Sequence, residues 1–247
     1  MQDGILALMS GLIHIVGARP NFIKAAPVIA ALEAAGAQQQ VIHTGQHYDR
    51  RMSEIFFEEL GLPEPDLNLG VGSGSHGTQT AALLVAMEET FTQAQPERVI
   101  VYGDVNSTLA AALTCAKLGI PIAHVEAGLR SFDDTMPEEI NRRVTDILSD
   151  PLYVTAPEGE VNLQREGISG DRVVFVGNPM IDTLLANLER FDPAPVQAAL
   201  GLEGDYAVAT LHRPANVDTP EAAAALIGAL RAATERLPLV LPLHPRG

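Results

Sequence analysis

The sequence predicts an α/β protein in which helices cover both faces of a doubly wound parallel sheet. The first observation behind this prediction is that short β-branched runs alternate with longer helical stretches along most of the chain. The second is that Pro or Ser opens several of the helical stretches, as helix starts prefer. The third is a length of 247 residues with 47% apolar side chains, which is enough to fill a large core.

Each expected strand is a short run rich in Val and Ile. The strands are expected over residues 12–17, 39–45, 98–104, 121–128, 151–156 and 172–178. The helices are expected over residues 20–36, 49–60, 75–93, 107–118, 137–148, 158–166 and 179–188. Because strands and helices alternate, the strands should run parallel, and ligands of such sheets bind at the carboxyl ends of the strands.

A domain boundary is expected after residue 190. Residues 191–205 contain two prolines and no clear strand, so we interpret them as a linker between a first domain, 1–190, and a second region, 206–247. That region predicts one β-α-β unit, which is too small to close a core of its own. We therefore expect either the start of an incomplete second domain or a unit that docks elsewhere.

The charge balance restricts the classes of partner. The chain has 16 Lys and Arg against 31 Asp and Glu, for a net charge of −15. A protein that binds nucleic acid or anionic lipid through phosphates needs a basic surface, so neither partner is expected. Any anionic ligand must therefore be held by a local group of cations.

Other patterns point away from a secreted, membrane or metal-dependent protein. The single Cys115 cannot form an internal disulfide, which fits a cytoplasmic location, and its apolar surroundings favour a buried thiol over a nucleophile. No run reaches the roughly 18 apolar residues of a membrane span. No HxxxH, HExxH or clustered Cys and His spacing is present, so we expect no metal.

Two glycine-containing segments are candidates for phosphate binding. The turn GARPN (17–21) leads into a helix start, where free N–H groups together with Arg19 and Lys24 could hold an anion such as a pyrophosphate. The alternative is an ordinary turn with a solvated Arg. The stretch GVGSGSHG (70–77) lacks the P-loop pattern, and a loop is the better interpretation.

Three carboxylates fall at the expected carboxyl ends of strands or at the helix starts that follow. Asp104 could be a base or could cap a helix, and Glu126 could be a tuned acid or base or could pair with Arg130. Glu138 could likewise serve chemistry or pair with Arg142 four residues later. Carboxylates gathered at this edge indicate proton transfer.

A fourth candidate lies beyond the expected linker. His212 and Arg213 follow a predicted strand in LHRPANVD (211–218), where the His could donate to a leaving phosphate or move a proton. A structural role for a single His is the alternative.

Six motifs in this order resemble the non-hydrolysing UDP-N-acetylglucosamine 2-epimerases of bacteria. They are GARPNFIKAAPV (17–28), TGQHYD (44–49), VYGDVNSTLAAA (101–112), AHVEAGLRSFDDTMPEEINRR (123–143), FVGNPMID (175–182) and TLHRPANVD (210–218). The resemblance runs from about Leu12 to the end of the chain. It implies two Rossmann-like domains in the glycosyltransferase-B arrangement, the second of them incomplete here by about the last third of the family's length.

The resemblance also implies an activity: reversible conversion of UDP-N-acetylglucosamine to UDP-N-acetylmannosamine without a nicotinamide or metal. In the family, C2 is deprotonated, UDP is eliminated to leave 2-acetamidoglucal, and UDP is added back after protonation of the opposite face. The candidate catalytic residues are Asp104, Glu126, Glu138 and His212, and the candidate substrate-binding residues are Arg19, Lys24, Arg142 and Arg213.

Two alternatives remain open from the sequence. One is a hydrolysing epimerase that releases free N-acetylmannosamine and UDP. The other is an incomplete chain that binds nucleotide sugars with weak turnover or none. Family members often form homodimers, so a homodimer is a further expectation that the resemblance brings.

Overall fold

The computed structural model describes residues 11–45, 59–210 and 220–242. The chain divides into two compact units, Met1–Leu188 and Glu189–Gly247, and each is described by itself. Part of the helix expected over 49–60 and the residues His212 and Arg213 lie outside the described residues.

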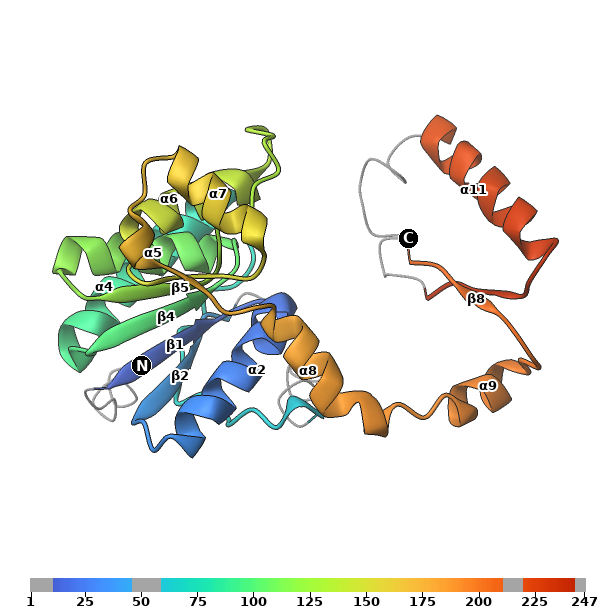
Figure 1. Cartoon of the computed structure of the whole chain (residues 1–247), viewed down its shortest axis with the longest axis horizontal. Coiled ribbons are helices and arrows are strands. Elements are labelled where there is room, and N and C mark those ends of the chain that lie inside the picture. Colours follow the sequence, from blue (N-terminus) through green and yellow to red (C-terminus); the bar gives the residue numbers. More distant parts are fainter. Residues whose placement is uncertain (1–10, 46–58, 211–219, 243–247) are drawn as a thin grey trace. The chain divides into compact units, whose positions relative to one another are not determined.

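The first unit is built on a seven-stranded sheet in the order β3-β2-β1-β4-β5-β6-β7 (Figure 1). Its strands are β1 (Leu12–Val16), β2 (Gln39–His43), β3 (Leu67–Asn68), β4 (Arg98–Tyr102), β5 (Ile122–Ala127), β6 (Leu152–Val154) and β7 (Val173–Phe175). Every pairing between neighbouring strands is parallel, which confirms the predicted fold class. The two-residue strand β3 was not expected from the sequence.

Helices cover both faces of this sheet. The described helices of this unit are α2 (Arg19–Ala34), α4 (His76–Ala94), α5 (Asn106–Leu118), α6 (Pro137–Leu148), α7 (Pro157–Arg165) and α8 (Pro179–Asn187), with a single 3-10 turn at Gly170–Arg172. A second 3-10 turn, Leu188–Arg190, spans the boundary between the two units. Figure 1 shows α4 and α5 on one face and α2 on the other. Their starts follow the predicted signals: Pro20 and Pro137 open α2 and α6, and Ser75 caps α4 by accepting from the Thr78 amide.

Alternation along the central strands builds two hydrophobic clusters. Val99 and Val101 of β4 pack with α4 and α5, whereas Ile100 and Tyr102 pack with α2. Because successive side chains of a strand point to opposite faces, one buried strand supports both layers. Cys115 lies in the first cluster, fully buried, and burial raises the pKa of its thiol to about 12.

The strand order fixes where a ligand site can form. β1 has β2 on one side and β4 on the other, so the chain changes direction across the sheet between β1 and β4. In doubly wound sheets the crevice at such a switch point, beyond the carboxyl ends of the strands, binds ligands. The loops after β1, β4 and β5 therefore surround the candidate site.

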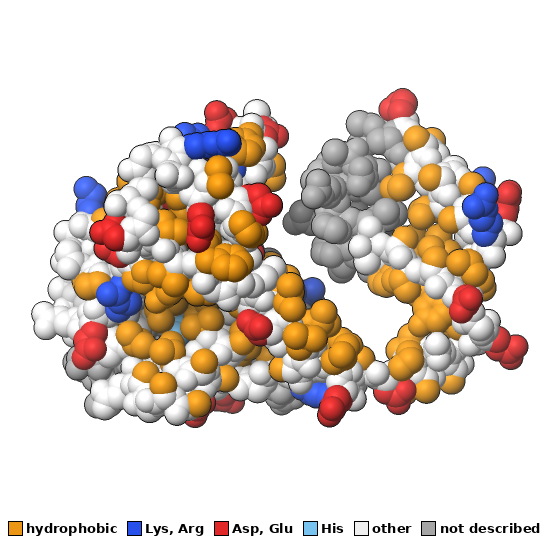
Figure 2. Space-filling model, viewed as in Figure 1, with side chains coloured by type: hydrophobic (Ala, Val, Ile, Leu, Met, Phe, Trp, Pro, Cys, Tyr) orange, Lys and Arg blue, Asp and Glu red, His pale blue; other side chains and the backbone are white. Residues whose placement is uncertain are grey.

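Apolar side chains remain exposed on the last helix of this unit. Ile181, Leu184 and Leu185 of α8 are all exposed, and Figure 2 shows hydrophobic atoms gathered over this helix. In the ranges described, every helix is too short or too polar to cross a bilayer.

The second unit contains the β-α-β arrangement that the sequence predicts. Its elements are α9 (Ala194–Leu200), β8 (Ala207–Val208), α11 (Pro220–Thr234) and β9 (Leu239–Val240), and β8 pairs in parallel with β9. Helix α9 falls within residues 191–205, the expected linker, so part of that segment is helical.

Candidate active site

The turn after β1 is bound to the end of β4. The Asn21 carboxamide oxygen accepts from the amides of Gly17 at 3.2 Å and Ala18 at 3.0 Å, and its nitrogen donates to the Tyr102 carbonyl at 2.8 Å. One buried side chain thereby closes the turn that opens α2 and connects it to the neighbouring strand. Arg19, the first residue of α2, lies half-buried at this carboxyl edge of the sheet.

Lys24 and Glu126 form an ion pair at the same edge. Their side chains are only 9% and 13% exposed, so the two charges compensate each other in a place that water reaches poorly. Gly103, at the end of β4, lies against the pair: a Cβ there would be 2.8 Å from the Lys24 Nζ and 3.1 Å from the Glu126 Oε2. The alternative pairing of Glu126 with Arg130 is wrong, because Lys24 of the second turn of α2 reaches Glu126 instead.

Asp104 forms the second carboxylate–cation contact, with Arg142 of α6. The same guanidinium donates to Glu139 at 3.0 Å, so Arg142 joins two carboxylates. Asp104 does not cap α5, since Val105 occupies the cap position without a side-chain bond. The expected pairing of Arg142 with Glu138 is also replaced, by the contacts to Asp104 and Glu139.

Glu139 shares Arg142 with Asp104, and the sequence did not single it out from its neighbour Glu138. It is 2% exposed and accepts from the Ser131 amide at 2.8 Å and the Ser131 hydroxyl at 2.9 Å. Burial acts to raise the pKa of Glu139, but the bonds from Ser131 and the charge of Arg142 lower it overall. Glu138, one position earlier, is only partly buried, and no partner to its side chain is seen among the described residues. The spacing of three residues between Glu139 and Arg142 was the available signal.

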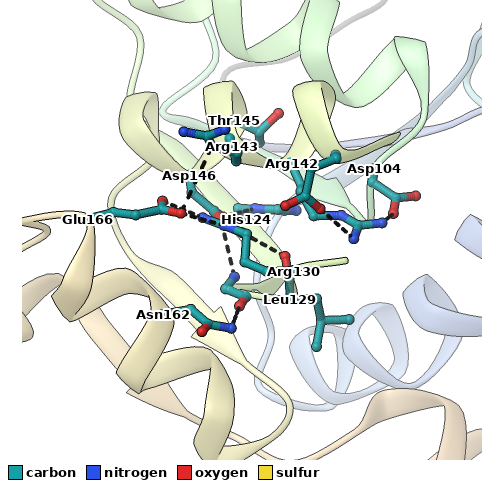
Figure 3. A network of polar contacts seen from close by, with 12 residues as sticks. Asp104, His124, Leu129, Arg130, Arg142, Arg143, Thr145, Asp146, Asn162 and Glu166 are labelled. Carbon is teal, nitrogen blue, oxygen red and sulfur yellow. Dashed lines mark hydrogen bonds and ion pairs between the residues drawn. The ribbon is translucent and has the colours of Figure 1, made fainter. Parts of the chain in front are cut away.

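A network of polar contacts, buried at its centre, lies beside the Asp104–Arg142 pair (Figure 3). His124 of β5 places Nε2 2.8 Å from the Gly103 carbonyl oxygen and Nδ1 2.7 Å from Asp146 of α6. The other Asp146 oxygen accepts from the Gly128 amide at 3.1 Å and lies 2.8 Å from Arg130. His124, Asp146 and the Arg130 side chain are all 0% exposed.

The charges of this network compensate one another. Burial acts to raise the pKa of Asp146, but the hydrogen bond and charge of His124 and the charge of Arg130 lower it overall. Arg130 also makes a bidentate contact with Glu166, with both distances 2.7 Å. Burial acts to lower the pKa of Arg130, and its bonds to Glu166 and Asp146 raise it overall. No sequence motif marks Asp146, because it lies in the interior of a helix and 22 residues along the chain from His124.

The Gly/Ser stretch 70–77 reaches the same edge. Its residues before His76 form neither helix nor strand, as predicted. Gln79 donates to the Gly72 carbonyl at 3.2 Å and accepts from Asn106 at 2.8 Å. Asn141 in turn donates to the carbonyl of Asp104 at 2.8 Å. This stretch is therefore connected to the start of α5 and, through α6, to Asp104.

The structure thus forms two ion pairs, Lys24–Glu126 and Asp104–Arg142, at the ends of the adjacent strands β4 and β5. Arg19 and Glu138 lie in the first turns of α2 and α6. Within residues 11–45, 59–210 and 220–242, no group of three or more His, Cys, Asp or Glu side chains is arranged to hold a metal ion. What the geometry offers is two carboxylates, each beside a cation, at the switch point of the sheet. Such a site suits proton transfer on an anionic ligand.

Comparison with known proteins gives a consistent result. A profile described as UDP-N-acetylglucosamine 2-epimerase matches residues 30–247. The UDP-2,3-diacetamido-2,3-dideoxy-D-glucuronate 2-epimerase of Pseudomonas aeruginosa is 45% identical over 239 residues, which are 95% of this chain and 67% of that protein. The UDP-N-acetylglucosamine 2-epimerase of Methanocaldococcus jannaschii is 46% identical over 211 residues, or 84% of this chain and 58% of that protein.

Solved structures agree with the sequence comparison. The crystal structure of the Methanocaldococcus jannaschii enzyme in complex with UDP-GlcNAc and UDP has a TM-score of 0.86 and 42% identity, covering 95% of this chain and 66% of that one. The Neisseria meningitidis enzyme bound to UDP-GlcNAc gives a TM-score of 0.84 at 28% identity. The chain spans about two thirds of the length of the relatives that it matches.

Proposed function

We propose that this chain, which belongs to the UDP-N-acetylglucosamine 2-epimerase family, inverts C2 of a UDP-linked 2-acetamido sugar. The substrate proposed first is UDP-N-acetylglucosamine, and the product is UDP-N-acetylmannosamine. The observation that carries the proposal is the pair of carboxylates, Asp104 and Glu126, at the ends of adjacent strands β4 and β5, each with a cation beside it.

The proposed reaction proceeds by elimination and re-addition. A carboxylate takes the C2 proton, the C2–H electron pair forms a C1=C2 double bond, and the C1–O bond breaks with its electrons leaving on UDP. The intermediate is 2-acetamidoglucal. A proton is then delivered to the opposite face of C2 while a UDP oxygen re-forms the bond to C1. No electrons are gained or lost overall, so the chemistry needs no redox cofactor.

Inversion requires proton-transfer groups on both faces of C2. Asp104, Glu126 and Glu138 are the proposed acids and bases, because they lie around one edge of the sheet and because they occupy the family's motif positions. Glu139 is a poorer candidate, since its carboxylate is buried and is already bound by Ser131 and Arg142. His212 and Arg213 remain proposed participants in UDP departure.

The cations of the site are proposed to hold the UDP diphosphate. Lys24 and Arg142 are both bound to carboxylates in the structure, and Arg19 lies at the start of α2, where helix N–H groups favour anions. A bound diphosphate would compete for these cations and release a carboxylate for proton transfer. In a chain with a net charge of −15, such a local group is what makes an anionic substrate acceptable.

A second substrate is favoured by one relative. The Pseudomonas aeruginosa protein, 45% identical over 95% of this chain, is a UDP-2,3-diacetamido-2,3-dideoxy-D-glucuronate 2-epimerase. Its substrate differs from UDP-N-acetylglucosamine by a second acetamido group and a C6 carboxylate, whereas inversion at C2 is common to both. We therefore propose the same reaction on this sugar as the alternative.

The test is to incubate the purified chain with each sugar nucleotide and identify the products by proton NMR. A manno-configured UDP-sugar, without free sugar, supports the proposal, and the faster of the two substrates identifies the specificity. Free N-acetylmannosamine with UDP would instead support a hydrolysing epimerase. No product from either substrate, beside an active Methanocaldococcus jannaschii enzyme, would contradict the proposal.

A matched pair of variants connects the activity to the site. Glu126→Gln removes the proposed proton-transfer group with little change of shape, and we expect it to lower turnover by about 100-fold or more. Glu97→Gln makes the same change at an exposed position just before β4, at the opposite edge of the sheet. It should leave turnover unchanged; equal losses in both variants would remove the role proposed for Glu126.

A homodimer and a cytoplasmic location are also proposed. The buried, unpaired Cys115 is compatible with a reducing compartment. Sedimentation velocity decides the first of these proposals and cell fractionation the second.

A further inference from the structure

The buried His124–Asp146 pair joins the two segments that carry the proposed acids. Gly103, which His124 contacts, directly precedes Asp104, and Gly128, which Asp146 contacts, follows Glu126 by two residues. Neither His124 nor Asp146 reaches the surface. The pair thus lies beneath the site without being exposed to a substrate, and it is not used in the reaction proposed above.

The contacts of His124 show which ring nitrogen carries a hydrogen and how the ring is oriented. A carbonyl oxygen only accepts hydrogen bonds, so the ring nitrogen Nε2, 2.8 Å from the Gly103 oxygen, carries a hydrogen and donates it. Nδ1 faces Asp146 at 2.7 Å. A ring held at both nitrogens has a fixed orientation, and so has the Gly103 peptide that it contacts.

The backbone at Glu126 shows why such support is needed. Glu126 has a backbone φ of 76°, a left-handed conformation that residues other than Gly rarely adopt. The pairing of β5 with β6 shifts register between Val125 and Ala127, around this residue. Strained backbone of this kind persists only where its surroundings impose it. His124 precedes the irregularity and the Asp146–Gly128 contact follows it, so the pair holds the strand on both sides.

The site lies directly against these supports. The Gly103 backbone is in close approach to Lys24 and Glu126, with only 2.8 and 3.1 Å between a Cβ at this position and their charged atoms. A rotation of the Gly103 peptide would therefore change the room left for the Lys24–Glu126 pair and the direction of Asp104. Displacements of about 1 Å at reacting groups lower enzymatic rates by about 100-fold.

We propose that His124 and Asp146 are positioning residues that set the relative placement of Asp104 and Glu126. His124 fixes the Gly103 peptide through Nε2, and Asp146 fixes both the His124 ring and the Gly128 amide. The expected loss of kcat rests on the proposed function, whereas the contact that fixes the Gly103 peptide does not.

Two substitutions of His124 separate the two contacts. Asn places its amide near the position of Nδ1, so His124→Asn keeps a donor to Asp146 and loses the bond to Gly103. Gln places its amide near Nε2, so His124→Gln retains a donor to Gly103. We expect His124→Asn to lower kcat for C2 inversion by about 100-fold with KM changed less than about threefold, and His124→Gln to recover most of kcat.

His14→Asn is the matched control. His14 is also 0% exposed and makes two hydrogen bonds, to Tyr102 and Gln39, but it does not contact Gly103. It should lower stability and keep kcat within about threefold. Retention of kcat in His124→Asn, or an equal loss in His14→Asn, would overturn the positioning role.

A second measurement does not depend on enzymatic activity. Proton NMR of the unsubstituted chain at neutral pH should show an Nε2–H resonance of His124 that exchanges slowly with water, because the hydrogen is buried and bound. A His124 ring without a hydrogen on Nε2, or one that exchanges freely, would refute the contact to Gly103. If the chain inverted no sugar, the proposed function would fail, and this measurement would still decide whether the pair holds the Gly103 peptide.

Discussion

Acidification should destabilise the first unit through His14, well above the pH at which carboxylates titrate. His14 is fully buried in β1; its Nδ1 lies 2.7 Å from the Tyr102 hydroxyl and its Nε2 2.9 Å from the Gln39 carboxamide oxygen. Because that oxygen only accepts, the neutral ring with a hydrogen on Nε2 satisfies both contacts. Burial lowers the pKa of His14 from 6.5 to about 4, against a smaller opposing effect of the Gln39 bond.

The sign and size of the effect follow from these two pKa values. The imidazole of His14 is half-protonated at pH 6.5 in the unfolded chain but only near pH 4 in the folded chain. The contribution of the neutral, buried ring to the free energy of unfolding is therefore complete above pH 6.5 and is lost as the pH falls toward 4. A pKa difference of about 2.5 corresponds to about 3 kcal/mol, of which about 2 kcal/mol is already lost at about pH 5.

Urea unfolding followed by circular dichroism at about pH 7.5 and about pH 5 measures this loss. His14→Asn replaces the ring by a group that does not titrate. It should be less stable than the unsubstituted chain at the higher pH, and its free energy of unfolding should decrease by about 2 kcal/mol less between the two conditions. An equal decrease in both proteins would refute the assignment of this acid sensitivity to His14.

Two further predictions concern the turn after β4 and the single thiol. Gly103→Ala places a Cβ 2.8 Å from the Lys24 Nζ at φ of 64°, so we expect turnover to fall by about 100-fold. Gly119→Ala, at φ of 69° with nothing within 4 Å, should cost about 1 kcal/mol of stability and leave turnover intact; equal activities would contradict this reasoning. Because burial raises the pKa of Cys115 to about 12, a thiol reagent at about pH 8 should modify it only after unfolding in urea, and rapid modification of the folded chain would show otherwise.

Most of the fold was predictable because its signals are local. Val99, Ile100 and Val101 are consecutive β-branched residues, and all three are buried although they face opposite sides of the sheet. Such a run is typical of a central parallel strand. The strand β3 and the helix α9 were missed for a physical reason. Two residues of strand are too short to show a period, and a seven-residue helix with Pro193 and Pro195 at its start resembles a linker.

The sequence indicated where the proposed site residues lie, but it did not indicate the side chains that they contact. The positions of Asp104 and Glu126 follow from where strands end, which the sequence reveals. The partner of Glu126 does not, because Lys24 lies on a helix that crosses the sheet and the strand is irregular at Glu126 itself. Glu138 and Glu139 are neighbours on one helix, and only the fold of residues 131–132 decides that the second is buried.

Proton exchange at C2 shows whether the carboxylates of this site transfer protons to and from the sugar. The purified chain is incubated with UDP-N-acetylglucosamine in heavy water, and deuterium at C2 of the recovered sugar nucleotides is measured by mass spectrometry and NMR. We expect deuterium at C2 with the unsubstituted chain and its loss in Asp104→Asn and Glu126→Gln. Epimer that forms without deuterium, or exchange that survives both substitutions, would contradict it.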